Sequence, residues 1–302
     1  SYPLWRSELG ADYVVLGAVQ KTGSGGATGY MVSVQLADVY KGSVMAAYQV
    51  ATDRNGIRAA GHQIANFLYE KLTGKKGMFA SQLAWVQVSG VGKARTYRLM
   101  MADSDGFDPK ALVTANYPLL SPSFSRDGKQ LAYAVIQNGQ SAIYVQNIMT
   151  GAARLVSRRP GLNASPSWSP DGTHLLATLS FEGNPNIYRL GLDGSIARLT
   201  DHAAIDTEAR YSPDGASIVF TSDRSGRPQI YRMSSGGGAA QRLTFVGTSN
   251  TSASFSPDGK YLVMVQENKG YHVALYTLGN GQVRLLSRGR DDQKPSFAPN
   301  SL

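Results

Sequence analysis

The sequence contains no cysteine, which excludes disulfide bonds, thiolate nucleophiles and cysteine-ligated zinc. Its four histidines include no close pair of the kind that binds zinc on a helix. No apolar run reaches the ~18 residues that span a bilayer, and no secretory signal peptide is visible. A Gly-x-Ser-x-Gly nucleophile elbow and a Gly-x-x-x-x-Gly-Lys phosphate loop are also missing. These absences argue against metal, hydrolytic and nucleotide chemistry, so we expect no enzyme, no cofactor and no metal site.

Polybasic tracts are missing as well, although the net charge is +9. The densest basic stretch, residues 71–76, holds only three lysines. No ladder of basic and aromatic residues marks a nucleic-acid groove. We therefore expect no nucleic-acid partner, while the positive charge leaves open a surface that attracts anions.

What the chain does contain is a repeated phrase, Ser-Pro-Asp-Gly or a close variant, along its last two-thirds. The Asp-Gly pairs begin at Asp127, Asp171, Asp214 and Asp258, and Asn300 takes the aspartate place in a degenerate fifth copy. The successive intervals are 44, 43, 44 and 42 residues. A period of this size is typical of β-propellers, in which each repeat forms one four-stranded blade. The repeat therefore predicts a propeller, an architecture that often serves as a binding platform.

The repeated phrase has a mechanical explanation. Proline fixes φ and removes one backbone donor. Aspartate accepts a hydrogen bond from the backbone two residues on, and glycine tolerates positive φ. We therefore interpret the repeated aspartates as turn formers rather than catalytic or metal-binding groups. An aromatic residue precedes each copy and is expected to anchor the inner strand between blades: Phe124, Trp168, Tyr211, Phe255 and Phe297.

The remaining strands follow from patterns that keep the same spacing. An aromatic or aliphatic residue seventeen positions after each aspartate predicts a third strand, and a later Arg-Leu pair predicts the outermost strand. Upstream, residues 83–88, 96–101 and 111–114 predict three strands of a first blade that lacks its innermost strand. Residues 103–108 are expected to form a hairpin turn, because they lack the bidentate glutamate of a calcium loop.

The N-terminal part follows another pattern. Residues 12–20, 30–39 and 44–50 read as strands, and apolar residues three and four apart predict a helix from Ile57 to Leu72 that ends at Gly74. The predicted domains are therefore a small α/β domain at 1–77, truncated at its start, and a propeller at 78–302. The propeller comprises a partial first blade, blades 2–5 and the first strand of a sixth. We expect an all-β six-bladed propeller whose ring is incomplete in this chain, with a closing strand beyond Leu302.

Five phrases extend the comparison beyond the repeat. They are Leu-Gly-Ala-Asp-Tyr-Val-Val-Leu-Gly at 9–17, Tyr-Glu-Lys-Leu-Thr-Gly at 69–74, Asp-Ser-Asp-Gly at 103–106, Ser-Asp-Arg-Ser-Gly-Arg-Pro-Gln-Ile-Tyr at 222–231, and Gln-Arg-Leu-Thr at 241–244. With the repeats in this order, nearly all of the chain resembles the TolB family, the periplasmic propeller proteins of the Tol–Pal system of Gram-negative bacteria.

The resemblance implies a periplasmic, monomeric, non-enzymatic protein with no membrane span. TolB proteins bind the lipoprotein Pal on the propeller face and TolA through an N-terminal extension, which we expect to be absent from this chain. Outer-membrane proteins and colicins are further partners that the family suggests. The system maintains outer-membrane integrity and contributes to cell division, and colicins exploit it during import.

The candidate binding residues lie in loops that enter the inner strands and vary between blades, whereas the Ser-Pro-Asp-Gly turns are monotonous. We call these segments, at 159–165, 201–208, 247–252 and 288–294, the channel-mouth loops. The resemblance places Pal on this face, and three loop residues (Asn163, Thr207 and Glu208) match the residue types of the family. The full set of predicted Pal-binding residues is Leu162, Asn163, Ser165, His202, Ile205, Asp206, Thr207, Glu208, Thr248, Asn250, Thr251, Asp291 and Asp292.

Other interpretations stay open at this point. Propellers of this repeat type also accompany prolyl-oligopeptidase-like serine hydrolases, so the chain would then be the propeller domain of such an enzyme without its catalytic domain. A third possibility is a carbohydrate or anion binder that uses the central channel and the positive charge. Without the resemblance, the channel-mouth loops would read as solvated loops with no partner.

Overall fold

The computed structural model describes residues 2–23 and 29–299, which form two compact units. The first comprises Ser1–Gln82 with Asp103–Phe107, and the second comprises Leu83–Ala102 with Asp108–Leu302. Asn300, the aspartate equivalent of the fifth repeat, lies outside the described residues. Within the described part of the chain, no helix has the length and hydropathy to cross a membrane.

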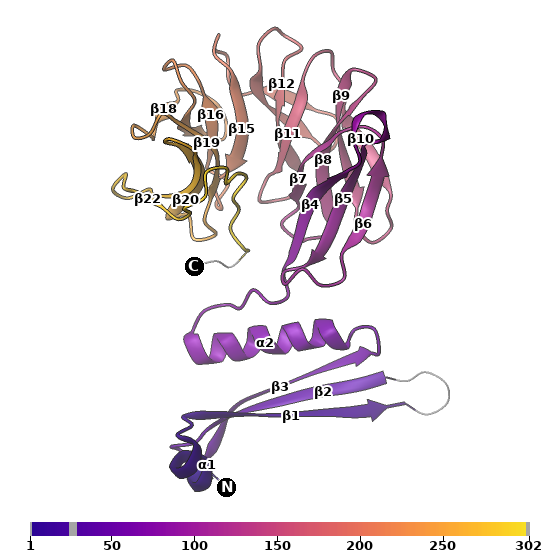
Figure 1. The fold of residues 1–302 in the computed structure, drawn as a ribbon, viewed down its shortest axis with the longest axis vertical. Coiled ribbons are helices and arrows are strands. Elements are labelled where there is room, and N and C mark those ends of the chain that lie inside the picture. The colour runs from indigo at the N-terminus through magenta and orange to yellow at the C-terminus, as the bar shows by residue number, and fades with distance from the viewer. Residues whose placement is uncertain (1, 24–28, 300–302) are drawn as a thin grey trace. The chain divides into compact units, whose positions relative to one another are not determined.

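The first unit is an antiparallel sheet of order β1-β2-β3 with a helix on one face (Figure 1). Helix α2 packs on β2 and β3, where Tyr48 stacks on Phe67 at 5.1 Å. The helix ends as predicted, with Gly74 at φ 70° and its N–H bonded to the Glu70 carbonyl. The short helix α1 was not predicted. The elements are α1 (Tyr2–Leu9), β1 (Tyr13–Thr22), β2 (Gly29–Asp38), β3 (Ser43–Asp53) and α2 (Ile57–Thr73).

The second unit consists of five antiparallel sheets arranged radially as propeller blades (Figure 1). Blade 1 has three strands, and blades 2–5 have four each; the described sheets do not close a ring. Blade 1 contains β4 (Gln82–Ser89), a 3₁₀ turn η1 (Gly92–Ala94), β5 (Thr96–Asp103) and β6 (Lys110–Ala115). Blade 2 contains β7 (Leu119–Phe124), β8 (Gln130–Gln137), β9 (Gln140–Asn147) and β10 (Ala153–Ser157).

Blades 3, 4 and 5 repeat the arrangement of blade 2, with the outermost strand shortened to two or three residues. Blade 3 contains β11 (Asn163–Trp168), β12 (His174–Leu179), β13 (Asn186–Gly191) and β14 (Ile196–Arg198). Blade 4 contains β15 (Asp206–Tyr211), β16 (Ser217–Ser222), β17 (Gln229–Ser234) and β18 (Gln241–Arg242). Blade 5 contains β19 (Ser249–Phe255), β20 (Tyr261–Glu267), β21 (Tyr271–Thr277) and β22 (Val283–Leu285).

The hydrophobic core lies between consecutive blades. One cluster joins Leu176 and Ile187 of blade 3 to Phe220 and Tyr231 of blade 4. The predicted aromatic anchor is also present, since Trp168 is buried and its indole N–H donates to the Ser123 carbonyl of the preceding blade at 3.0 Å. The inner strands β7, β11, β15 and β19 therefore lie side by side around the propeller axis.

The repeated aspartates are turn formers, as predicted. In blade 3, Ser169 Oγ donates to Asp171 Oδ1 at 2.5 Å, and the Thr173 N–H donates to the same oxygen at 3.0 Å. Gly172 follows at φ 72°. The hydroxyl of Ser169 and the Thr173 amide lower the pKa of Asp171 from 3.8 to about 2. The other copies, at Asp127, Asp214 and Asp258, make the same pair of bonds.

Replacing Asp171 by asparagine should remove a pH-dependent part of the stability. A carboxylate whose pKa is depressed on folding stabilises the protein above pH 3.8, and this contribution disappears as the pH falls toward about 2. The free energy of unfolding of wild type and Asp171→Asn, compared by urea denaturation, should therefore converge as the pH falls through this window. A difference that stays constant across that range would contradict the prediction.

Candidate functional site

The inner strands share a backbone feature that the sequence did not reveal. Equivalent positions of five successive copies have positive φ, between 50° and 58°, although none is glycine: Ser121, Ser165, Glu208, Ser252 and Lys294. In blades 2–5 the position coincides with a break in the register between the inner strand and its neighbour. Such a β-bulge re-aims side chains and is frequent beside functional sites. Positive φ in residues with a Cβ is uncommon and costs conformational energy, so its fivefold repetition marks a structural requirement.

Four of these positive-φ residues, Ser165, Glu208, Ser252 and Lys294, line a cavity of about 450 Å³, which we call the mouth cavity. Its wall combines apolar groups of Ile205, Pro228, Val265 and Tyr271 with hydroxyl, carboxylate and ammonium groups. This mixture suits recognition of a polar macromolecular surface with a few apolar anchors. The remaining lining residues are Thr207, Thr221, Asp223, Thr251 and Gln293.

A carboxylate and an ammonium group meet at the mouth cavity. Glu208 Oε1 lies 2.6 Å from Lys294 Nζ, and Glu208 also accepts bonds from the Ser252 hydroxyl at 2.8 Å and the Thr221 hydroxyl at 3.1 Å. Burial by itself would raise the pKa of Glu208, but Lys294 and the bonds from Ser252 hold that pKa below its ordinary value. The ion pair thus links blade 4 to the segment that follows blade 5.

Replacing Lys294 by methionine should raise the pKa of Glu208, because burial would then act without the opposing ammonium. NMR titration of the Glu208 carboxyl carbon measures this change. Lys269→Met is the matched control, since it removes another exposed lysine, which lies in the turn between β20 and β21. An unchanged titration of Glu208 in Lys294→Met would show that Lys294 does not set the charge state.

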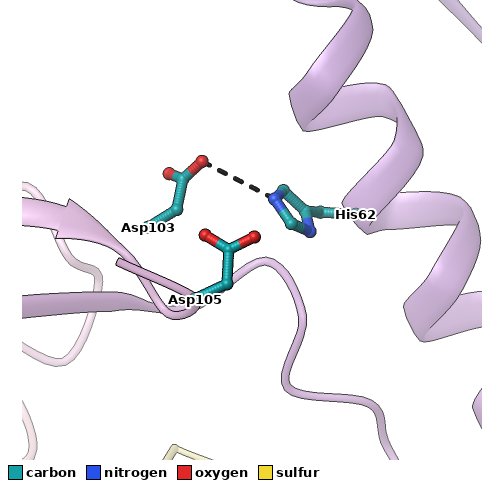
Figure 2. A group of neighbouring side chains, drawn as sticks. All are labelled: His62, Asp103 and Asp105. Carbon is teal, nitrogen blue, oxygen red and sulfur yellow. Dashed lines mark ion pairs between the residues drawn. The ribbon is translucent and has the colours of Figure 1, made fainter. Parts of the chain in front are cut away.

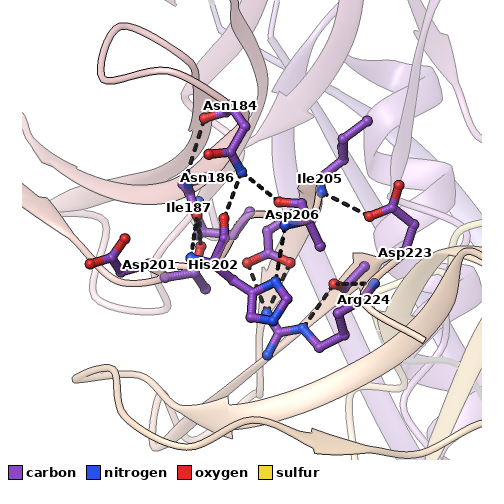
Figure 3. Close-up of polar contacts among 12 residues, drawn as sticks. Asn184, Asn186, Ile187, Asp201, His202, Ile205, Asp206, Asp223 and Arg224 are labelled. Atoms are coloured by element: carbon purple, nitrogen blue, oxygen red, sulfur yellow. Dashed lines mark hydrogen bonds and ion pairs between the residues drawn. The ribbon is translucent and has the colours of Figure 1, made fainter. Parts of the chain in front are cut away.

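The loop before β15 is fastened by side chains of two blades (Figure 3). Asn184 Nδ2 donates to the carbonyls of His202 and Ala204, each at 2.6 Å. Asp223 Oδ1 accepts from the Ile205 N–H at 2.8 Å. These contacts fix the backbone and leave the Ile205 side chain 47% exposed at the mouth.

A buried ion pair closes the same loop. Arg224 Nη2 lies 2.9 Å from both carboxylate oxygens of Asp206, and Arg224 Nε donates to Ser222 Oγ at 2.9 Å (Figure 3). The Asp206 side chain is 0% exposed. The Arg224 guanidinium also lies over the rings of Phe220 and Tyr231, at 5.3 and 4.9 Å from their centroids. Arg224 therefore joins the loop before β15 to the aromatic core of blade 4.

The predicted binding residues fall into three groups. Exposed residues are Leu162, His202, Ile205, Thr248 and Asp291. Half-buried residues are Ser165, Thr207, Glu208, Thr251 and Asp292. Fully buried residues are Asn163, Asp206 and Asn250. The mouth cavity brings together five of the set, namely Ser165, Ile205, Thr207, Glu208 and Thr251.

The buried members support the channel-mouth loops from within. Asn163 Nδ2 donates to the Arg159 carbonyl at 2.7 Å, and its Oδ1 accepts from Ser157 Oγ at 2.6 Å. Asn250 Nδ2 likewise donates to the Val246 carbonyl at 2.8 Å. Both side chains satisfy backbone groups of a turn that has no strand partner. They shape the surface instead of contributing their own side chains to it.

Two exposed apolar residues of this face were missed by the sequence analysis. Phe245 and Val246 are 72% and 56% exposed, immediately before the third channel-mouth loop. The Arg242 guanidinium lies 4.7 Å from the centroid of the Phe245 ring. Two adjacent apolar residues between an outer and an inner strand indicate exposed apolar surface in the connecting loop. The predicted loop, 247–252, begins two residues too late to include them.

A separate side-chain cluster lies in the first unit, where His62, Asp103 and Asp105 have the spacing of metal ligands (Figure 2). His62 Nε2 is 3.6 Å from Asp103 Oδ2. Arg58 already donates to both carboxylates, at 3.1 Å to Asp103 and through a short bond to Asp105. The Phe107 N–H donates to Asp105 Oδ1 at 3.0 Å, as in the expected turn. The Arg58 guanidinium therefore already supplies the positive charge that a metal ion would bring to these two carboxylates.

Comparison with known proteins gives a consistent result. The family described as TolB beta propeller domain matches residues 69–302. Tol-Pal system protein TolB of Xanthomonas oryzae pv. oryzae (strain MAFF 311018) is 45% identical over 304 residues, which cover 99% of this chain and 68% of that protein. The crystal structure of TolB from Acinetobacter baumannii matches with a TM-score of 0.89 and 37% identity, over 100% of this chain and 75% of that one.

Hydrolases share only the architecture. A puromycin hydrolase structure matches with a TM-score of 0.53 at 14% identity, over 90% of this chain and 44% of that one. Likeness at this identity shows the fold alone. The family match over residues 69–302 and the 45% identity together show that the chain belongs to the TolB family of Tol-Pal system proteins.

Proposed function

We propose that this chain is a non-enzymatic periplasmic scaffold that binds the lipoprotein Pal on the channel-mouth face. The observation that carries the proposal is the mouth cavity, a hollow of mixed polar and apolar lining with exposed apolar side chains on loops that differ between blades. Relatives of 45% identity are named as components of the Tol-Pal system, which supports a partner from that system.

Binding would combine a few apolar anchors with a surrounding polar surface. Leu162, Ile205 and Phe245 are exposed on three successive loops, and each offers apolar area to a partner. Burial of such side chains at the centre of an interface commonly supplies most of the binding energy. The hydrogen bonds of Asn184, Asp223 and Asn250 hold the loops in place before binding, which reduces the ordering cost.

The wider role follows from the family. As part of the Tol–Pal system, the protein would contribute to outer-membrane integrity and to cell division, and colicins would meet it during import. TolA would bind through an N-terminal extension. We also propose that the boundary between the α/β domain and the propeller lies between residues 77 and 78. A hydrolase propeller is not favoured, since the hydrolase likeness is confined to the fold.

Replacing Ile205 by arginine should weaken binding of purified Pal at least about tenfold, or about 1.4 kcal/mol. The substitution removes an anchor that is 47% exposed and puts a charge at the mouth cavity. Isothermal titration calorimetry measures the dissociation constant. Thr207→Arg, which narrows the same cavity, is expected to act in the same direction.

Met149→Arg is the matched control. Met149 is 87% exposed in the turn between β9 and β10, away from the channel-mouth loops, so Pal affinity should not change. Melting curves of all three variants should coincide with wild type. Wild-type affinity in both Ile205→Arg and Thr207→Arg would remove this face from consideration.

A further inference from the structure

One residue of the inner strands breaks the repeat. Two positions after each positive-φ residue, four of the five copies carry serine: Ser123, Ser167, Ser254 and Ser296. Blade 4 carries Arg210 at this position, on the innermost strand β15. A long cation thus takes the place of a small hydroxyl beside the propeller axis.

The register of blade 4 shows where the Arg210 side chain lies. Arg210 pairs with Val219 across the strands β15 and β16, and cross-strand partners share one face of a sheet. Val219 belongs to the same core cluster as Ala253 and Leu262 of blade 5. The guanidinium group is therefore directed to the side of blade 4 where the neighbouring wall is largely apolar.

Within the described residues, the guanidinium of Arg210 has few partners. Its one hydrogen bond runs from Nη1 to the carbonyl of the adjacent Ala209 at 3.0 Å, and it forms no ion pair. A guanidinium has five N–H donors, so most of its donor capacity is unused. Glu208, the acid whose charge acts on Arg210, is committed to Lys294, Ser252 and Thr221.

The surroundings favour an added anion. Burial lowers the pKa of Arg210, and the charge of Glu208 only partly opposes this effect. A partly buried charge without a counterion is costly, whereas a bidentate oxoanion satisfies both the charge and the donors.

We propose that the inner wall of blade 4 holds a small oxoanion, a phosphate or a carboxylate, on the guanidinium of Arg210. This site lies deeper along β15 than Ile205 and Thr207, and it does not depend on the proposed Pal interface. A planar fork of donors suits two oxygens of one anion, which a lysine at the same place would not reproduce.

The proposal is tested by calorimetric titration of the full chain with inorganic phosphate in chloride buffer at constant ionic strength. Wild type should bind phosphate, and Arg210→Ser, which restores the serine of the other copies, should lose that binding. Arg210→Lys keeps the charge and should bind at least about tenfold more weakly, because it loses the bidentate geometry. Arg227→Ser removes an exposed arginine of the same blade and should bind like wild type.

Parallel titrations with sulfate and acetate identify the chemistry. Binding of phosphate and sulfate alone indicates a tetrahedral oxoanion, and binding of acetate indicates a carboxylate; both support the site if Arg210→Ser abolishes them. Melting temperatures in chloride provide a second readout, since Arg210→Ser should melt no lower than wild type. Absence of any oxoanion binding in wild type, or equal binding in Arg210→Ser and Arg210→Lys, would overturn the proposal.

Discussion

Replacing Phe220 by alanine should lower the free energy of unfolding of the propeller by about 3–5 kcal/mol. The ring is 0% exposed and packs between blades 3 and 4, where it contacts the cluster that contains Leu176 and Tyr231. Deleting it removes apolar burial and leaves a cavity that the rigid strands around it fill only in part. Equilibrium urea denaturation followed by tryptophan fluorescence measures the loss.

Phe245→Ala is the control for the same chemical change. Phe245 is 72% exposed in a channel-mouth position, so its removal should change the unfolding free energy by less than about 0.5 kcal/mol. The pair of variants separates burial from residue type. If Phe220→Ala lowered the unfolding free energy no more than Phe245→Ala does, the packing between blades 3 and 4 would not be a main source of the propeller's stability.

Replacing Asp206 by alanine should cost about 3–5 kcal/mol of unfolding free energy, because it leaves the buried charge of Arg224 without its partner. The carboxylate is 0% exposed and receives two bonds of 2.9 Å from that guanidinium. The loss should appear as a lower urea midpoint, and the loop that presents Ile205 should become more mobile by hydrogen exchange.

Two further variants test whether the unpaired arginine causes the loss of stability in Asp206→Ala. Asp201→Ala removes an 85% exposed partner of Arg198 in the same loop and should cost no more than about 1 kcal/mol. The double variant Asp206→Ala/Arg224→Met removes both charges and should recover part of the lost stability, because no unpaired ion remains. Equal losses in the single and the double variant would contradict an origin in the unpaired arginine.

The blade architecture was predictable because its signals are local. Each Ser-Pro-Asp-Gly turn is specified by bonds within a few residues, such as Ser169 and Thr173 to Asp171, so reading the phrase predicts the turn. The helix end at Gly74 follows from one residue in the same way. Repetition then multiplied these short-range signals into a period that fixes the fold class.

The channel mouth was less predictable because its contacts are remote in sequence. Glu208 and Lys294 meet over 86 positions, and no pattern in the chain announces that pair. Asn163 was expected at the surface because it is polar and lies in a variable loop, yet it is buried where the turn needs donors and acceptors. Polarity alone does not separate a residue that contacts a partner from one that shapes the loop.

The positive-φ residues of the inner strands limit how a partner can engage the propeller axis. An inner strand is a sheet edge, and a straight edge with unpaired N–H and C=O groups would accept an extended peptide as an additional strand. The kink at Ser165, Glu208 and Ser252 interrupts each edge near its midpoint. A partner's peptide therefore cannot add to this edge as a continuous strand. Selectivity between partners must then reside in side chains and loop shape, which can diverge without altering the blades.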